Sequence, residues 1–152
     1  MHDTRWSVLK GDAQVQEHLA AIAREEPFPN VAELVSDLVY YTLSLRPLAE
    51  RGDSYKYSFH LFIVRHDIVR LKAIEAGRTP RNYLPVNAER LLTPDEWNAL
   101  EYRVGEQMEQ HRAGVVRFVR ESIANVAIDV PRRKEYLEYL DEMIEAWGSQ
   151  QA

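Results

Sequence analysis

Residues 93 to 126 hold the pattern that most constrains the fold of this chain. Thr93 can accept a hydrogen bond from the backbone N–H of Glu96, and the Glu96 side chain can return one to the backbone of Thr93. Pro94 fits the first helical position, where its missing N–H costs nothing. Apolar or seam residues then recur every three or four positions, at Trp97, Leu100, Val104, Met108, His111, Val115, Val119 and Val126. The pattern predicts one continuous helix, about 50 Å long at 1.5 Å per residue.

Four other segments show the same helical period. Their predicted ranges are 12–26, 30–45, 53–76 and 131–148. Asn30 and Asp53 are suited to cap the second and third of these helices, and Gly77 is suited to end the third. Pro47 should kink or end the second helix near Leu45. The long connection between the third helix and Thr93 contains two prolines and no helical pattern of its own.

These segments predict an all-α protein with a single-domain, up-and-down bundle of about five helices and a long fourth helix. The chain of 152 residues divides into an N-terminal arm (1–11), a helical bundle (12–148) and a frayed tail (149–152). The third and fourth helices are expected to form an antiparallel pair at the core. An overlong fourth helix leaves part of its stripe uncovered, so we expect a homodimer with part of that helix in the interface.

Composition excludes several classes of function. The chain has no cysteine, which rules out disulfides, thiolate metal sites and a cysteine nucleophile. No apolar run is long enough for a signal peptide or a membrane span, so we expect a cytoplasmic protein without membrane contact. The net charge of −5 gives no general argument for nucleic acid as a partner. No motif indicates a cofactor.

Two acidic pairs are the main candidate for catalysis. Glu106 and Glu109 lie on one predicted helix, and Glu138 and Asp141 lie on the next. Facing pairs of this kind can hold Mg²⁺ through carboxylate oxygens. The spacing resembles the pattern in the all-α nucleotide pyrophosphohydrolases of the MazG type, and the resemblance covers these four residues. It implies a Mg-dependent hydrolase, whereas the competing interpretation is a solvated helix face.

The histidines offer less. His111 lies in the apolar seam of the fourth helix, where a histidine is usually bonded to a neighbour rather than to a ligand. His60 and Asp67 share a face of the third helix, which could orient the imidazole. The all-α dimeric nucleases of the HEPN type need four to six residues between an arginine and a histidine. Arg103 and His111 are too far apart for that pattern.

Basic residues mark two candidate surfaces for a partner or an anion. Arg78 and Arg81 lie in the long connection. Arg132, Arg133 and Lys134 lie at the start of the last helix, where their charge opposes the helix dipole. Such violations are expected where an external group compensates. We therefore expect that these three residues contribute more to binding than to folding.

No complete catalytic constellation occurs in the sequence. The function that fits best is a non-enzymatic helical interaction module, such as a homo-oligomeric adaptor, regulator or assembly factor, that acts through protein–protein contacts. The first alternative is the Mg-dependent nucleotide hydrolase built on the two acidic pairs. The second is nucleic-acid or anion binding through residues 78–90 and the start of the last helix.

Overall fold

The computed structural model describes residues 30–77, 90–103 and 105–150. Within these ranges the regular elements are all helices: α2 (Val31–Glu50), α3 (Ser54–Glu75), α4 (Pro94–Ala99), α5 (Met108–Asn125) and α6 (Arg133–Gln150). The all-α prediction is therefore confirmed for the described part of the chain. None of the described helices is both long and apolar enough to cross a membrane. The predicted arm at 1–11 and the predicted helix at 12–26 lie outside the described residues.

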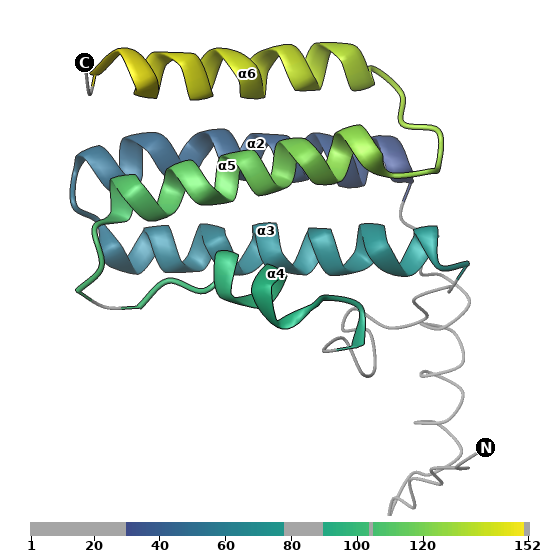
Figure 1. The fold of residues 1–152 in the computed structure, drawn as a ribbon, viewed down its shortest axis with the longest axis horizontal. Coiled ribbons are helices and arrows are strands. Elements are labelled where there is room, and N and C mark those ends of the chain that lie inside the picture. The colour runs from purple at the N-terminus through teal and green to yellow at the C-terminus, as the bar shows by residue number, and fades with distance from the viewer. Residues whose placement is uncertain (1–29, 78–89, 104, 151–152) are drawn as a thin grey trace, which may run out of the picture.

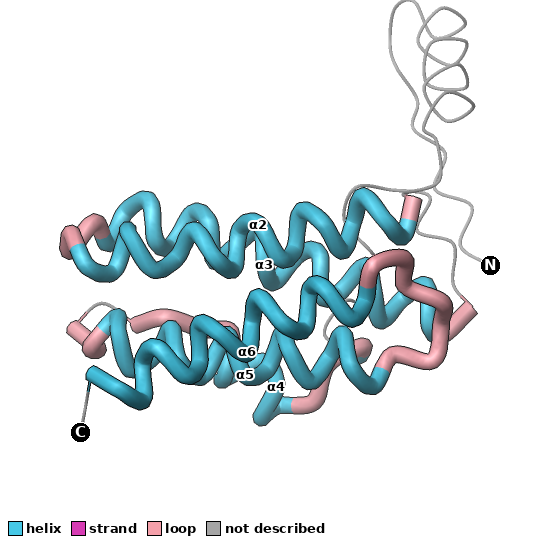
Figure 2. Tube along the Cα trace, turned by 90° about the horizontal axis from the view of Figure 1, so that it is seen from above, coloured by secondary structure: helices cyan, strands magenta, loops and turns pink. Residues whose placement is uncertain are grey.

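The four longer helices lie lengthwise beside one another, and the short α4 lies against the outside of this group (Figures 1 and 2). Within the pairs α2–α3 and α5–α6 the helices are antiparallel. The helices α3 and α5, in contrast, run parallel. Tyr57 near the start of α3 bonds to His111 near the start of α5, at 2.8 Å. At the other end, Glu75 accepts a hydrogen bond from the backbone of Ala127, just beyond α5, at 2.9 Å.

The strictly up-and-down order and the antiparallel pairing of the third and fourth helices are therefore wrong. The chain returns along the outside of α3 before α5 begins, and this return segment contains α4 (Figure 1). Because this return segment contains only the short α4, α5 starts at the same end of the bundle as α3 and runs in the same direction.

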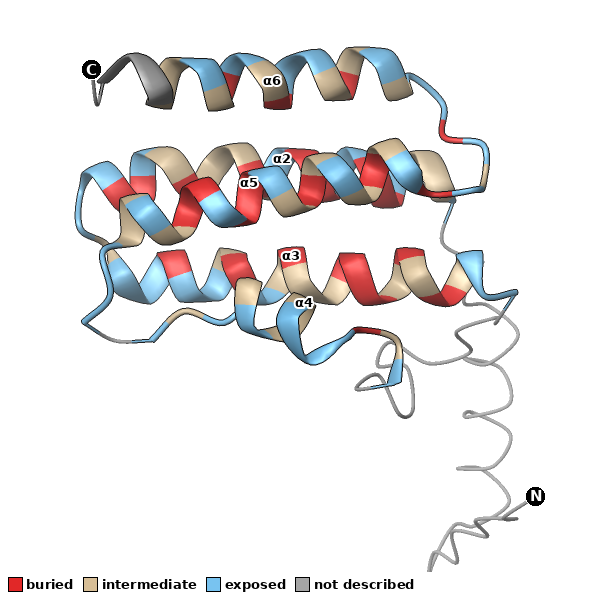
Figure 3. Cartoon of the chain, viewed as in Figure 1, coloured by how far each residue is buried: buried red, intermediate tan, exposed pale blue. Residues whose placement is uncertain are grey.

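One hydrophobic core joins the long helices. The helix α2 contacts α3, α5 and α6, so it is the central element. Buried residues follow the sides of the helices that face each other (Figure 3). The largest fully buried side chains are Tyr57, Leu38, Leu45, Ile68, Leu71, Leu100, Ile123 and Leu140.

The expected long fourth helix is two helices, and this is the main correction to the sequence analysis. The capping box at Thr93 is present, but α4 ends at Ala99 after six residues, and α5 has 18. Gly105 has a φ of +104°, which no helix permits. Leu100, just after α4, is buried in the core, and after it the ring of Tyr102 lies 5.2 Å from that of Tyr57.

Other local signals have mixed outcomes. Asn30 and Asp53 cap α2 and α3 as predicted, and Gly77 follows α3 with a left-handed φ of +67°. Pro47 does not end α2, which continues to Glu50. Pro47 is exposed and close to the end of the helix, so the hydrogen bond that it removes is one of the last. The helix α6 begins at Arg133 rather than Pro131, and Gly148 does not end it.

Candidate functional site

The helix α3 carries two aromatic and aliphatic stripes on opposite sides. The inner stripe faces the core and consists of Tyr57, Leu61, Val64, Ile68 and Leu71. The outer stripe begins with Tyr55, Phe59, Phe62 and His66, at the same alternating spacing of four and three residues. Each outer residue lies two positions from an inner one, which is about 200° around a helix. The outer stripe therefore points away from the core.

The outer stripe is open to solvent at the N-terminal half of α3. The exposed fractions are 84% for Tyr55, 58% for Phe59 and 49% for Phe62. Tyr40 on α2 is 63% exposed. Single exposed apolar residues are common on proteins, but a contiguous group of large aromatic rings is a feature of contact surfaces.

Ring contacts link the two helices into one surface. Tyr40 packs edge-on against Tyr41, and Tyr41 against His60, each with centroids 5.2 Å apart. His60 lies 6.1 Å from Phe59. Further along α3, Phe62 stacks on His66 at 6.3 Å. We call these residues the aromatic face: Tyr40, Tyr41, Tyr55, Phe59, His60, Phe62 and His66.

The two helices that form the aromatic face carry opposite charge. The helix α3 has four basic residues (Lys56, Arg65, Arg70, Lys72) and two acidic ones (Asp67, Glu75), a net charge of +2 in a chain of −5. The helix α2 has three acidic residues (Glu33, Asp37, Glu50) and one basic one (Arg46), a net charge of −2. The face is therefore basic on its α3 side and acidic on its α2 side.

Part of this charge is not neutralised within the chain. Lys56 on α3 and Glu33 and Asp37 on α2 are exposed and form no ion pair with a described residue. Arg65 lies over aromatic rings instead, with its guanidinium carbon 5.8 Å from the centroid of Phe62 and 5.7 Å from that of Trp97. A cation held in this way keeps its charge at the edge of the face.

The two histidines of the face are held neutral. The Nδ1 atom of His60 lies 2.6 Å from the hydroxyl of Ser44, which also donates to the carbonyl of Tyr41 at 2.7 Å. Burial, and then the nearby Lys56, lower the pKa of His60 below its ordinary value. Burial and the charge of Arg70 lower the pKa of His66 in the same way. Near neutral pH both imidazoles therefore belong to the apolar part of the face.

The expected pairing of His60 with Asp67 does not occur. Asp67 is buried, and its carboxylate pairs with Arg70, with 3.7 Å between the oxygen and the nitrogen. Burial raises the pKa of Asp67 to about 6, against the opposing charge of Arg70. The partner of His60 is Ser44, and no pattern in the sequence predicted this contact.

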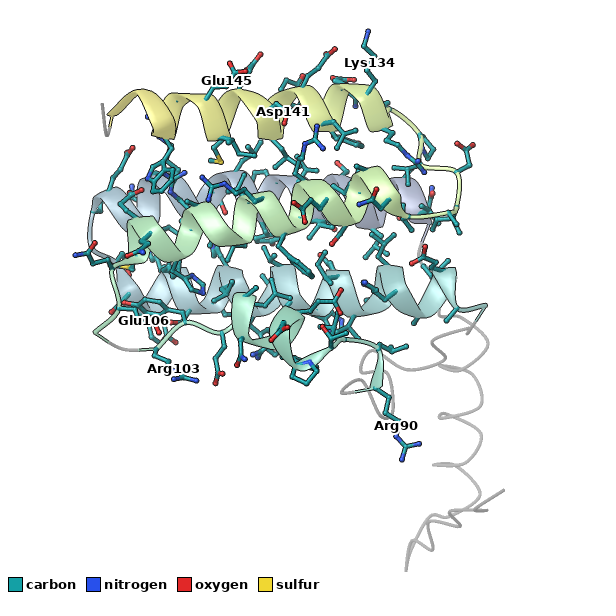
Figure 4. The ribbon with its side chains drawn as sticks, in the orientation of Figure 1. Arg90, Arg103, Glu106, Lys134, Asp141 and Glu145 are labelled. Carbon is teal, nitrogen blue, oxygen red and sulfur yellow. The ribbon has the colours of Figure 1, made fainter. Side chains whose placement is uncertain are left out.

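The two acidic pairs are not brought together. Glu106 lies in the turn before α5, where its carboxylate accepts from the backbone of Arg103 at 3.2 Å. Glu109 binds the buried Arg112 at 2.6 Å. Asp141 on α6 binds Arg120 through two hydrogen bonds of 2.8 and 3.2 Å. Figure 4 shows Glu106 below the start of α5 and Asp141 on the far side of that helix.

Glu138, the fourth carboxylate, is 3.7 Å from Lys134 in an exposed pair on α6. Across the described residues, no three histidine or carboxylate side chains are grouped so that they could hold a metal ion. The geometry that the hydrolase alternative needs is thus missing from this part of the chain.

The basic residues at the start of α6 have partners within the chain. Arg132 binds Glu135 at 2.6 Å. Arg133 donates to the backbone carbonyls of Val126, at 3.1 Å, and of Ile128. Its charge therefore stabilises the C-terminal end of α5 rather than opposing the dipole of α6. Lys134 points into solvent (Figure 4) and is 92% exposed. Arg78 and Arg81 lie outside the described residues.

His111 takes part in a buried cluster, as expected for a seam histidine. Its Nδ1 atom is 2.8 Å from the hydroxyl of Tyr57, and its ring lies 5.5 Å from that of Tyr102. Burial lowers the pKa of His111. An open polar hollow of about 660 Å³ lies beside it, lined by Asn98, Glu101, Arg103, Glu106, Gln107 and Gln110. Its side chains carry mixed charge.

No protein-family model, curated protein or solved structure matches this chain. The case for a function therefore depends on the residues themselves.

None of the candidate surfaces that the sequence indicated includes the aromatic face. Phe59 and Phe62 each lie two positions before Leu61 and Val64 of the inner stripe. The signal was present in the spacing, because two residues in a helix differ by about 200° and cannot share one face. A helix with two opposed stripes must contact something on both sides or leave one side exposed.

Proposed function

We propose that this protein is a non-enzymatic helical interaction module that acts through protein–protein contacts, and that the aromatic face is its contact surface. One observation carries the proposal: Tyr55, Phe59 and Phe62 follow one helical stripe and are about half exposed or more. Aromatic rings of this kind are enriched at interfaces, where they supply most of the binding energy.

The surroundings of the face fit this role better than a structural one. The core is complete without these side chains, because the inner stripe of α3 already packs against α2 and α5. Charged residues border the rings on both helices, as at the polar rim of a contact surface. A catalytic role has less support, since His60 has Ser44 as its hydrogen-bond partner and no carboxylate in the described part of the chain bonds to it.

Cross-linking in the native cells tests the proposal. The wild-type protein is compared with the double variant Phe59→Ser/Phe62→Ser and with the control Tyr139→Ser. Tyr139 is 43% exposed on α6, away from the aromatic face, so it matches the loss of an exposed aromatic ring. We expect the wild type and the control to cross-link to the same proteins, and the double variant to lose them. Retention of every partner by a folded double variant would refute the proposal.

A further inference from the structure

We infer that the partner of the aromatic face is a second copy of this chain, bound about a two-fold axis so that α2 of each copy lies against α3 of the other. This inference rests on the proposed function and adds the identity of the partner. The distribution of charge on the face and the area of the face support this partner.

The charge pattern makes the face complementary to itself. Asp37 on α2 and Arg65 on α3 lie at nearly the same level along the two antiparallel helices, because Ser44 on α2 contacts His60 on α3. A two-fold axis parallel to the helices keeps this level and places the α2 side of one copy over the α3 side of the other. Asp37 of each copy then meets Arg65 of the other, which is how an isologous contact repeats a pair twice.

The alternative two-fold arrangement, with α3 against α3, is disfavoured by the same residues. It would place Lys56 and Arg65 of one copy close to those of the other. Like charges beside a helical seam oppose pairing, and such flanking charges decide which helices associate. When α2 of one copy meets α3 of the other, an acidic edge faces a basic edge, and this repulsion is absent.

The area is sufficient for a specific but moderate contact. A Phe or Tyr side chain buries about 150–250 Å², so the exposed parts of Tyr40, Tyr55, Phe59 and Phe62 amount to roughly 400–600 Å² per copy. Two copies would bury about 1,000 Å² of aromatic surface, close to the lower limit for a specific interface. We therefore expect a dimer that dissociates in the micromolar range.

The contact is stable only while the face remains apolar at its centre. His60 lies between Tyr41 and Phe59, and both neighbours contact its ring. A neutral imidazole can be buried there without an unpaired charge. The hydrogen bond between His60 and Ser44 also fixes the ring orientation, so the centre of the face is formed before the second copy binds.

Sedimentation equilibrium on the purified full-length chain tests the inference, with circular dichroism to check the helix content of each variant. The wild type should change from 17.7 kDa to twice that mass as concentration rises through the micromolar range. The double variant Phe59→Ser/Phe62→Ser should remain a monomer, and Tyr139→Ser should behave as the wild type. A wild type that stays monomeric at several hundred micromolar would overturn the inference.

Two charge-reversed variants test the arrangement of the helices. The acidic-edge variant is Asp37→Lys, and the basic-edge variant is Arg65→Glu. Each should weaken its own self-association by about tenfold or more, because like charges then meet across the interface. An equal mixture of the two should form a mixed dimer. If the acidic-edge variant dimerises as well as the wild type, α2 does not take part and the arrangement is wrong.

The outcomes separate this inference from the proposed function. A monomeric wild type whose cellular cross-links are lost in Phe59→Ser/Phe62→Ser would keep the interaction module but give the face a different partner. A dimer that survives Phe59→Ser/Phe62→Ser, with unchanged cellular cross-links, would overturn both.

Discussion

The inner and outer stripes of α3 are made of the same kinds of residue at the same spacing, and their environments are opposite. Leu61 and Val64 on the inner stripe are 5% and 0% exposed, whereas Phe59 and Phe62 on the outer stripe are 58% and 49% exposed. The two stripes share one backbone, so helix propensity cannot separate them. The difference comes from the neighbours, since α2 and α5 cover one side and leave part of the other open.

This comparison shows that an apolar stripe has two possible uses. A covered stripe stabilises the fold by removing apolar surface from water. An uncovered stripe contributes little to folding and keeps the same free energy available for association. The two stripes should therefore respond differently to the same substitution.

The largest expected difference is between Leu61→Ala and Phe59→Ala. Leu61→Ala should lower the free energy of unfolding by about 2–5 kcal/mol, because it removes buried methyl groups and leaves a cavity. Phe59→Ala should change it by no more than about 0.5 kcal/mol, as for other exposed positions. Urea unfolding of the two variants at low protein concentration gives both values. A loss of several kcal/mol in Phe59→Ala would mean that the outer stripe is part of the core.

Asp67 provides a second test, because it is a charged residue buried on the covered side. Its pKa in the folded protein is about 6, above the unfolded value of 3.8, so the folded state holds the proton more tightly. The contribution of Asp67 to the free energy of unfolding should therefore be most favourable below about pH 4. It should fall by about 2–3 kcal/mol as the pH rises through 6. Asp67→Asn should remove most of that fall. Unfolding measured against pH checks it, with the exposed Asp129→Asn as the control.

The start of α6 yields a smaller effect and distinguishes two neighbouring cations. Arg133 donates to the carbonyls of Val126 and Ile128, whereas Lys134 is 92% exposed. Arg133→Ala should cost about 1.5–3 kcal/mol, the range for hydrogen bonds that involve a charged group. Lys134→Ala should leave the urea midpoint unchanged. If Arg133→Ala and Lys134→Ala have the same urea midpoint, the hydrogen bonds of Arg133 do not stabilise the fold. The prediction that the basic residues at the start of α6 serve binding would then be favoured.

The smallest expected effect is at the cap of α4, which borders the aromatic face through Trp97. Thr93 accepts from the backbone of Glu96 at 3.3 Å, and Glu96 returns a bond of 2.7 Å. Thr93→Ala should cost about 1 kcal/mol, the usual loss for a helix cap. A urea midpoint that stays within error would show that Lys72, 2.7 Å from Glu96, holds α4 in place without the cap.

Local signals in the sequence predicted helix starts well. Asn30, Asp53 and Thr93 each cap a helix through a side-chain bond to a nearby backbone N–H, which depends only on neighbouring residues. The all-α class followed from the same local patterns. The aromatic face could not be predicted from local patterns. Whether an apolar stripe is buried or exposed depends on whether a helix from a distant part of the sequence packs on it.

The break before α5 shows where periodicity misleads. Leu100 and His111 fit one continuous seam, yet Leu100 is the C-cap of α4 and His111 lies in α5, where it contacts Tyr57. Apolar spacing alone cannot tell a long helix from two helices that share a core. Gly105 was the one residue whose conformational freedom marked the turn.

We propose that the outer stripe of α3 serves association and not folding. Thermal melting of the wild type and of Phe59→Ser/Phe62→Ser over a range of protein concentrations tests both parts, because self-association raises the Tm with concentration. At low micromolar concentration the two proteins should melt at the same temperature. At several hundred micromolar the wild type should melt a few degrees higher while the variant is unchanged. A variant that already melts lower at the lowest concentration, or a wild type whose Tm is independent of concentration, would contradict the account.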